Sequence, residues 1–458
     1  KVTFSGLTGG AATAAHIHGA AAPGVIAPVM INFPGFPAAA SGTYNTALSI
    51  TPVQIAAMQA GQTYVNIHNA AFPGGEIRGQ LALSQPGDIE PNGTPATASP
   101  IASSSRVRGN IAPNGDVDVY SFFGTAGAKV YAAVQTSGSA NASSDSQLRL
   151  IGTDGTTVLE FDEDDGSLGG LSSTIAGATL PSGGLFYLQV NHFSATNQLR
   201  PYDLYFRLQS DPTTPEVEPN DTPATANVLP ATGHVSGARN PAAATEQDWY
   251  SFTANAGDTV YLGLDMDPER DNVQWDGRLG IALFGDANNQ ILVVNDASTG
   301  SVANPLSEAI FMTIKTAGTY FAFVDSASAA VGGPTATYNL SVTVLPKVDE
   351  GVNCTTYTST NVPQTIGTEP GLVSSTITVP GNPRIADLDV SIQLNHTRMS
   401  DIDAQLRSPA ANDNGIFTDI GASAIGGQTQ MDATFDDEAG LPPTFTVLKG
   451  LGIQPELA

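Results

Sequence analysis

Short runs in which apolar and polar residues alternate recur along most of the chain. Alternation with a period of two turns every second side chain to the same face of a strand, and these runs are rich in β-branched and aromatic residues. The clearest runs are Val130–Val134, Leu185–Val190, Tyr202–Leu208, Val260–Leu264 and Tyr338–Val344. The pattern therefore predicts an all-β protein.

One segment near the N-terminus has helical spacing instead. Between Thr51 and Gly61, Thr51 suits an N-cap and Pro52 suits the first turn, and the apolar residues that follow fall on one side of a helix. We expect one short helix here.

The middle of the chain contains an internal repeat. Residues 89–98 read IEPNGTPATA, and residues 217–226 read VEPNDTPATA, an offset of 128 residues (89 to 217). The segment DVYSF at 118–122 then pairs with DWYSF at 248–252, an offset of 130 (118 to 248). A drift this small is typical of insertions confined to loops, so the two stretches are predicted to be copies of one domain.

The repeat divides the chain into four parts. A Pro- and Thr-rich segment at 211–215 separates the two copies, and the sequences on either side of the repeat do not resemble it. A length of 458 residues is also too great for a single core. We expect serial β-sandwich or jelly-roll domains at residues 1–84, 88–210, 216–345 and 348–458.

Composition and charge narrow the possible partners. The chain has 17 Lys plus Arg against 43 Asp plus Glu, a formal net charge of −26, which would repel nucleic acid and favour divalent cations. The alternative is that the acidic surface serves only solubility. The single cysteine, Cys354, excludes a disulfide framework within these residues. No run of about 18 apolar residues is present, so no membrane span is predicted.

The first 83 residues carry motifs of an extracellular domain family. The motifs are AHIHG at 15–19, YVNIH at 64–68 and FPGGEIRGQL at 72–81. In these segments the N-terminal block resembles the CHRD domain, first described in chordin. Because that family carries further strands before the equivalent of residues 3–6, the resemblance implies a domain that is incomplete at its N-terminal end.

Each repeat opens with Glu-Pro-Asn and continues with an Asp-x-Tyr-x-Phe strand. In these motifs both copies resemble the bacterial pre-peptidase C-terminal (PPC) domain. The resemblance implies a jelly-roll-like sandwich of bacterial origin that accompanies secreted proteases and other exoproteins. There it aids secretion, stability or attachment to a polymer, carries out no chemistry itself and, in a subset of the family, binds calcium.

The C-terminal block has a third set of motifs, including VSSTI at 373–377, IADLDV at 385–390 and FDDEA at 435–439. It is similar to the P domain of proprotein convertases. The final strands of that family are absent from the sequence, which implies a jelly roll that is incomplete at its C-terminal end. The disulfide partner of Cys354 would be missing with them.

Carboxylates at the start of each repeat predict calcium sites, since calcium takes six to eight oxygen ligands. The second repeat offers Glu216, Glu218, Asn220, Asp221 and Asp248. The first three alternate, so they would face one side of an extended segment. The alternative is a solvated acidic linker.

The first repeat offers a related but different set of ligands: Asp88, Glu90, Asn92, Asp116 and Asp118. Gly93 stands where the second repeat has Asp221, so a weaker site is predicted. A third candidate calcium site in the P-like block combines Asp401, Asp403, Asp436 and Asp437, for which the alternative is carboxylates that cap turns.

Three histidines form a separate candidate site. His16 and His18 alternate around Ile17, so both imidazoles face one side of a strand, and His68 lies near the end of another predicted strand. Three imidazoles can bind copper or zinc. The alternative is a set of histidines bonded to backbone carbonyls or to Glu76.

The motifs favour a non-catalytic role. The sequence contains no nucleophile elbow, zincin motif, P-loop or dinucleotide-binding motif. We therefore expect a secreted or cell-surface structural or adhesive protein with calcium-stabilised modules, which assembles with itself by strand completion into a layer or fibre. One alternative is the accessory region of a secreted subtilisin-like protease. The other is a module that binds an extracellular polymer, with Trp249 or Trp275 as an exposed stacking surface.

Overall fold

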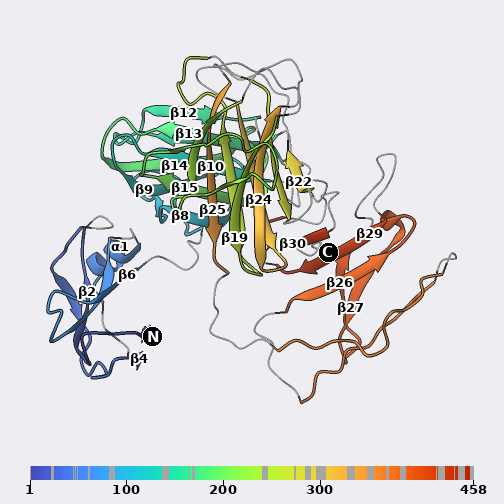
Figure 1. The fold of residues 1–458 in the computed structure, drawn as a ribbon, viewed down its shortest axis with the longest axis horizontal. Coiled ribbons are helices and arrows are strands. Elements are labelled where there is room, and N and C mark those ends of the chain that lie inside the picture. Colours follow the sequence, from blue (N-terminus) through green and yellow to red (C-terminus); the bar gives the residue numbers. More distant parts are fainter. Residues whose placement is uncertain are drawn as a thin grey trace. The chain divides into compact units, whose positions relative to one another are not determined.

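The structure is a computed structural model that describes the chain except for residues 1, 22–24, 45, 47, 49, 60–61, 82–87, 137–143, 165, 168–170, 240–245, 273–274, 284–289, 295–305, 327–335, 348–354, 368–370, 382–387, 419, 421–428, 438, 442–448 and 454–458. Cys354 therefore lies outside the described residues. Within them the fold is all-β, with one short α-helix and one turn of 3-10 helix, as the alternating pattern predicted (Figure 1).

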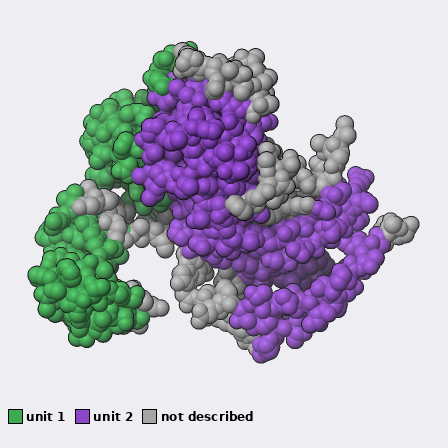
Figure 2. All heavy atoms as spheres, viewed as in Figure 1, with its two compact units in different colours: residues 1–212, 269–272, 298–307 green, residues 213–268, 273–297, 308–458 purple. Residues whose placement is uncertain are grey.

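The chain divides into two compact units, which Figure 2 colours separately. The first comprises residues 1–212 together with 269–272 and 298–307. The second comprises residues 213–268, 273–297 and 308–458. Each unit is described in turn.

The N-terminal domain of the first unit contains two small sheets and the predicted helix, α1 (Pro52–Gln59). Its four-stranded sheet has the order β3-β2-β5-β6, and β1 pairs with β4. Ala15, Ile17 and Ile67 pack into the core from one face of the larger sheet, so the residues between them face the other way. The strands are β1 (Val2–Phe4), β2 (Ala12–His18), β3 (Val29–Asn32), β4 (Gly42–Tyr44), β5 (Tyr64–Asn69) and β6 (Ile77–Gln80).

The first repeat contains a four-stranded sheet, β13-β10-β15-β8, and a five-stranded sheet, β12-β11-β14-β9-β7. Buried residues of both sheets, such as Phe122 and Phe206, meet in one hydrophobic core, with ring centroids 4.6 Å apart. The strands are β7 (Ser99–Pro100), β8 (Ser104–Ile111), β9 (Val117–Gly124), β10 (Lys129–Gln135), β11 (Ser146–Ile151), β12 (Val158–Asp162), β13 (Ser173–Thr179), β14 (Gly184–His192) and β15 (Leu199–Gln209).

The second repeat has the same strand order as the first. Its five-stranded sheet runs β17-β19-β24-β21-β22, and its other sheet contains the run β18-β25-β20-β23. The short β16 adds to β18 in parallel. The strands are β16 (Thr214–Pro215), β17 (Asn227–Val228), β18 (His234–Ala238), β19 (Asp248–Ala254), β20 (Thr259–Asp265), β21 (Gly277–Leu283), β22 (Gln290–Val294), β23 (Ser307–Ile314), β24 (Gly318–Ser326) and β25 (Thr337–Leu345).

Strands of the C-terminal block continue a sheet of the second repeat. β30 pairs antiparallel with β23 and parallel with β29, so the sheet grows to eight strands ending in β26. The sequence predicted a separate jelly roll for this block. The new elements are β26 (Val390–Asn395), η1 (Met399–Asp401), β27 (Ala404–Arg407), β28 (Asp413–Phe417), β29 (Gln430–Phe435) and β30 (Lys449–Ile453).

Both tryptophans lie inside the second repeat. Trp249 is fully buried and stacks on Phe323 with ring centroids 4.7 Å apart, and Trp275 is 3% exposed. The expectation that one of them offers an exposed stacking surface is therefore wrong. Trp249 faces inward from β19, whereas Trp275 lies just before β21 and donates its indole N–H to the Thr337 carbonyl at 2.9 Å.

Candidate metal-binding sites

Each repeat places an aspartate inside its sandwich. Asp118 and Tyr120 are two residues apart on β9, so both face inward, and both are fully buried. Asp248 and Tyr250 have the same positions on β19 and are also fully buried. A carboxylate buried in this way needs partners, because removing it from water is unfavourable.

A tyrosine from the opposite sheet supplies one partner in the second repeat. Tyr338 of β25 donates a hydrogen bond to Asp248 Oδ2 at 2.7 Å, and its hydroxyl lies 2.6 Å from that of Tyr250. Both hydroxyls also lie near Glu216 Oε2, at 3.0 Å from Tyr338 and 2.9 Å from Tyr250. The linker residue Glu216 is thereby drawn onto the sandwich.

The first repeat reproduces this arrangement with Asp88 in place of Glu216. Tyr202 of β15 donates to Asp118 Oδ2 at 2.5 Å and also bonds to the hydroxyl of Tyr120. Tyr120 lies 3.5 Å from Asp88 Oδ1. The two copies thus differ by one methylene in the acidic side chain that lies beside Tyr120 or Tyr250.

The Glu-Pro-Asn turn at the start of each repeat brings its glutamate and asparagine oxygens beside the buried aspartate. In the second repeat the Asn220 backbone N–H donates to Glu218 Oε2 at 3.0 Å, and the Trp249 N–H donates to the Asn220 carbonyl at 3.0 Å. The first repeat makes the matching bonds, from Asn92 to Glu90 at 2.9 Å and from Val119 to Asn92 at 3.1 Å. The turn is therefore fixed beside the buried aspartate in both copies.

Two groups of carboxylates result, one in each repeat. Asp88, Glu90 and Asp118 each place one oxygen within 4.8 Å of the others, and so do Glu216, Glu218 and Asp248. Glu90 and Glu218 are exposed, whereas the aspartates are fully buried. Each group therefore runs from the sandwich interior to solvent, which gives an ion a path of entry.

Fully buried oxygen atoms without a partner distinguish these groups from ordinary acidic surfaces. Among the described residues, Asp248 Oδ1 and Asn220 Oδ1 accept no hydrogen bond in the second repeat, and Asp118 Oδ1 and Asn92 Oδ1 accept none in the first. Buried polar atoms in proteins are nearly always satisfied. An oxygen-liganded cation such as calcium would satisfy all four, so the residues fit the ion that the PPC resemblance implied.

The pKa values of the two buried aspartates are raised, as expected for carboxyl groups that lack a neighbouring positive charge. Burial and the nearby charges of Glu216, Glu246 and Glu218 raise the pKa of Asp248 to about 8, although the hydrogen bond from Tyr338 opposes the shift. Burial likewise raises the pKa of Asp118 to about 8, with the charges of neighbouring carboxylates adding to the rise. Without a cation, both carboxyls are therefore largely protonated at neutral pH.

Two residues predicted as ligands lie outside these groups. Asp221 is exposed and is not a member of the group formed by Glu216, Glu218 and Asp248. Asp116 instead accepts hydrogen bonds from the backbone N–H groups of Ala112 and Val117, both at 3.0 Å, and so closes a turn. The weaker calcium site predicted for the first repeat rested on its lack of a counterpart to Asp221. In the second repeat Asp221 does not belong to the carboxylate group.

The four carboxylates of the C-terminal block are not brought together in the part of the chain that the structure describes. Asp401 and Asp403 are exposed, and Asp401 lies 3.7 Å from the Arg398 guanidinium. Asp436 is buried and Asp437 exposed, and neither is grouped with the first pair. A calcium site here stays a prediction.

The sequence interpretation missed the tyrosines and two glycines that hold the carboxylates. Gly109 lies directly opposite Tyr202 in the β8–β15 pairing, and Gly237 lies opposite Tyr338. A Cβ on Gly237 would come within 2.3 Å of the Tyr338 ring and 2.6 Å of Glu216 Oε2. The signal was present, because these glycines share the 128-residue offset of the repeat (109 to 237).

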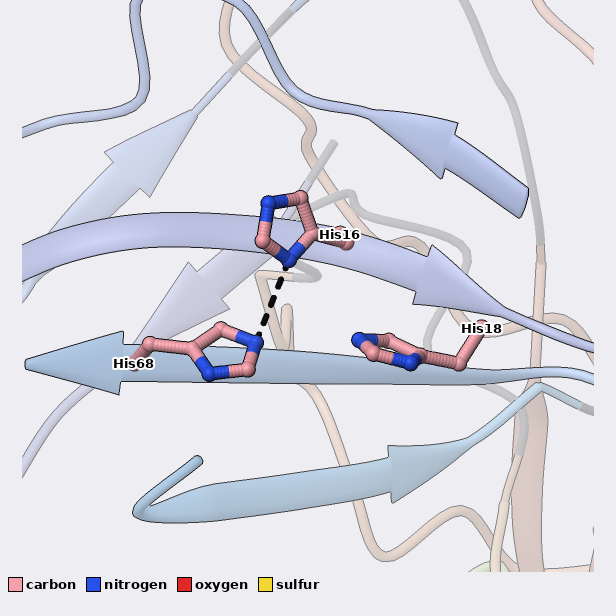
Figure 3. A group of neighbouring side chains, drawn as sticks. All are labelled: His16, His18 and His68. Atoms are coloured by element: carbon pink, nitrogen blue, oxygen red, sulfur yellow. Dashed lines mark hydrogen bonds between the residues drawn. The ribbon is translucent and has the colours of Figure 1, made fainter. Parts of the chain in front are cut away.

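The three histidines of the N-terminal domain lie together on one sheet (Figure 3). His16 Nδ1 is 3.1 Å from His68 Nε2, and His18 and His68 bond through Nδ1 to the carbonyls of Ala27 and Pro73, both at 2.9 Å. Glu76 instead accepts bonds from Thr8, Gly9 and Asn69. The hydrogen bonds to backbone carbonyls that the alternative interpretation predicted are thus present for His18 and His68. In both rings the other nitrogen, Nε2, belongs to the group of three histidines.

Comparison with known proteins identifies one of the predicted domains. Residues 1–81 match the model of the CHRD domain family, which confirms the resemblance of the N-terminal block. The PPC and P-domain resemblances stay predictions. No curated protein matches the chain. Among the described residues, no helix has the length and apolar character needed to cross a membrane.

Solved structures with partial likeness include a periplasmic inhibitor of g-type lysozyme, PliG from Aeromonas hydrophila (19% identity, 24% of this chain and 94% of that chain, TM-score 0.19). Another is the CUB1-EGF-CUB2 structure of human MASP-1/3 (9% identity, 53% of this chain and 100% of that chain, TM-score 0.16). A third is a tandem CBM22 pair from Paenibacillus barcinonensis (11% identity, 52% of this chain and 94% of that chain, TM-score 0.17). At these TM-scores the likenesses carry no argument about function.

Proposed function

We propose that this chain is a non-catalytic extracellular protein of structural or adhesive type, in which each repeat binds one calcium ion. The observation that carries the proposal is the pair of fully buried, unpartnered oxygens, Asp248 Oδ1 and Asn220 Oδ1, beside Glu216 and Glu218. The first repeat supplies the same chemistry. Carboxylate and amide oxygens are the ligands that calcium prefers in proteins.

The ion fastens the segment that precedes each sandwich. In the second repeat Glu216 and Glu218 belong to this segment, whereas Asp248 begins a strand of the sandwich. Contacts already in place between them are the Glu216 bonds to Tyr250 and Tyr338 and a bond from the Ala238 N–H at 2.6 Å. A bound cation neutralises the three converging carboxylates and so completes the attachment.

Several features support the extracellular and non-catalytic parts of the proposal. The CHRD match covers the N-terminal block, serial all-β modules make up the rest, and the sequence lacks recognisable catalytic motifs. Free calcium is abundant outside cells, so weak sites would be occupied there. Calcium that binds only the folded state stabilises it by mass action.

The test is a count of bound calcium in chelator-treated and calcium-reloaded protein, by mass spectrometry of the metal and by titration calorimetry. We expect two ions per chain. Asp248→Asn should remove one and the double variant Asp118→Asn/Asp248→Asn both. Asp221→Asn is the matched control, because this carboxylate lies in the same segment but outside the group.

Two results would contradict the proposal that each repeat binds calcium. If the reloaded protein holds no calcium and its melting temperature is unchanged by chelator, the buried carboxyls are simply protonated, and the calcium proposal is wrong. If Asp221→Asn removes an ion as readily as Asp248→Asn, the binding is a general property of the acidic segment. Pull-down on insoluble polymers and sedimentation would then test the remaining roles of polymer binding and self-assembly.

A further inference from the structure

The β2–β5 pairing determines which face of the N-terminal sheet carries the histidines. Ala14 lies opposite His68, and His18 lies opposite Tyr64, so the side chains of His16, His18 and His68 all leave the same face. The other face carries Ala15, Ile17 and Ile67 into the hydrophobic core. The histidines therefore do not serve that core.

Two backbone carbonyls fix the protonation of the rings. Ala27 O accepts from His18 Nδ1 and Pro73 O accepts from His68 Nδ1, so each ring carries its proton on Nδ1 and presents the Nε2 lone pair to the group. A carbonyl bonded to the second ring nitrogen is the usual outer partner of a metal-ligating histidine. Both rings are more than nine-tenths buried, which holds this orientation.

The ring nitrogens of the three histidines converge. One ring nitrogen of each histidine lies within 4.8 Å of the other two, and the His16 Nδ1 to His68 Nε2 distance is 3.1 Å. Two nitrogens bound tetrahedrally to one zinc ion lie about 3.3–3.4 Å apart. His18 Nε2 is buried and has no hydrogen-bond partner among the residues that the structure describes, so its lone pair is available to a metal ion.

We propose that His16, His18 and His68 form a binding site for one divalent transition-metal ion, zinc or copper. The ligand atoms are His16 Nδ1, His18 Nε2 and His68 Nε2. His16, which is partly exposed, would ligate as the tautomer whose single proton is on Nε2, which leaves the Nδ1 lone pair for the metal. Three protein ligands leave a coordination position for water or a small anion.

The ligand chemistry selects the class of ion. Neutral imidazoles suit zinc and copper, whereas calcium and magnesium prefer oxygen ligands. The guanidinium carbon of Arg78 lies 3.5 Å from the centre of the Tyr64 ring. Tyr64 in turn stacks on His18, with centroids 5.0 Å apart and the planes inclined by 12°. The site is therefore chemically distinct from the carboxylate groups of the repeats.

The first experiment uses the full chain without a polyhistidine tag and with excess calcium present, so that carboxylate sites do not compete. Titration with zinc against a chromophoric chelator is expected to show one tight site per chain. Copper(II) should bind the same site more tightly than zinc. Its electron paramagnetic resonance spectrum should show hyperfine coupling to three imidazole nitrogens.

Substitutions distinguish binding at this site from non-specific metal binding by surface histidines. His18→Gln and His68→Gln should each weaken zinc binding by more than about 100-fold, beyond the 10–100-fold typical of lost outer partners. His396→Gln is the control, since this partly exposed histidine lies in the C-terminal block, outside the group. Unchanged affinity in His18→Gln, or an equal loss in His396→Gln, would overturn the proposal.

The spectrum of the unmodified protein keeps the proposal testable if either variant fails to fold. Coupling to three nitrogens supports the site, and coupling to fewer overturns it. The absence of a stoichiometric zinc or copper site in the folded chain would overturn it as well. None of these outcomes depends on calcium binding by the repeats.

Discussion

The hydroxyl of Tyr338 lies 2.7 Å from Asp248 Oδ2, a hydrogen bond that joins the two sheets of the second repeat beside its carboxylate group. Tyr202 and Asp118 make the same bond in the first repeat. In each copy a tyrosine of one sheet, on β25 or β15, therefore orients an aspartate near the start of a strand of the other sheet, β19 or β9. The bond links the stability of the sandwich to the geometry of its acidic group.

Removal of the Tyr338 hydroxyl should weaken both properties. Tyr338→Phe removes the hydroxyl that donates to Asp248 Oδ2 and one of the two tyrosine hydroxyls beside Glu216, and we expect a loss of about 1–3 kcal/mol in the free energy of unfolding together with weaker calcium binding. Denaturant unfolding and calorimetry measure the two effects. In the control Tyr320→Phe, the lost hydroxyl bonds to the Thr316 carbonyl at 2.7 Å, so stability should fall but calcium affinity should not.

The glycine opposite Tyr338 should tolerate no side chain. In Gly237→Ala the new Cβ would meet both the tyrosine ring and Glu216, and we expect overpacking to cost about 1–3 kcal/mol and to abolish calcium binding in the second repeat only. Gly318→Ala in the same repeat is the control, because a Cβ there meets nothing within 4 Å. Equal effects of the two substitutions would argue against a role for the close approach.

Replacement of Asn220 by leucine should separate stability from binding. The Asn220 amide is fully buried and neither of its polar atoms is bonded, so Asn220→Leu should stabilise the calcium-free protein by about 1–3 kcal/mol and eliminate binding at that site. Asn227→Leu should do the reverse for stability, since the Asn227 amide bonds to both backbone groups of Val217. Chemical unfolding in chelator distinguishes the two. Destabilisation by both substitutions would mean that Asn220 has a structural role.

The raised pKa values predict an unusual dependence of stability on pH. Because Asp118 and Asp248 have a pKa of about 8 when folded, against an ordinary value of 3.8, the folded state holds more protons than the unfolded state between these limits. The free energy of unfolding of the calcium-free protein should therefore be highest below about pH 4 on this account and fall as pH rises towards 8, by up to about 1.4 kcal/mol per pH unit and site.

Calcium should reverse this trend, because the ion favours the ionised carboxylates and its binding releases protons. The measurement is urea unfolding from pH 4.5 to 8.5, with chelator and with calcium, and the control is Asp118→Asn/Asp248→Asn. We expect a smaller slope in that variant, because other carboxyls whose pKa is raised, such as Asp88, remain. A slope unchanged by the double substitution would assign the pH dependence to other groups.

Local pattern was enough to predict much of this protein. The period-two runs correctly predicted strands such as β10, β15 and β25, and the spacing of Thr51 and Pro52 predicted α1. The same period placed His16 and His18 on one face and turned Asp248 and Tyr250 inward. These features are determined by the sequence because strand geometry relates residues only two positions apart, whatever the rest of the chain does.

The partners across the sheets were decided by the tertiary structure. Nothing local indicated that Tyr338 would reach Asp248, or that β30 would add to β23. The exclusion of Asp221 from the carboxylate group also depends on how the turn docks against β19. Composition and spacing cannot resolve such choices, because they depend on the register between strands distant in sequence, and a shift of one residue moves every side chain to the opposite face.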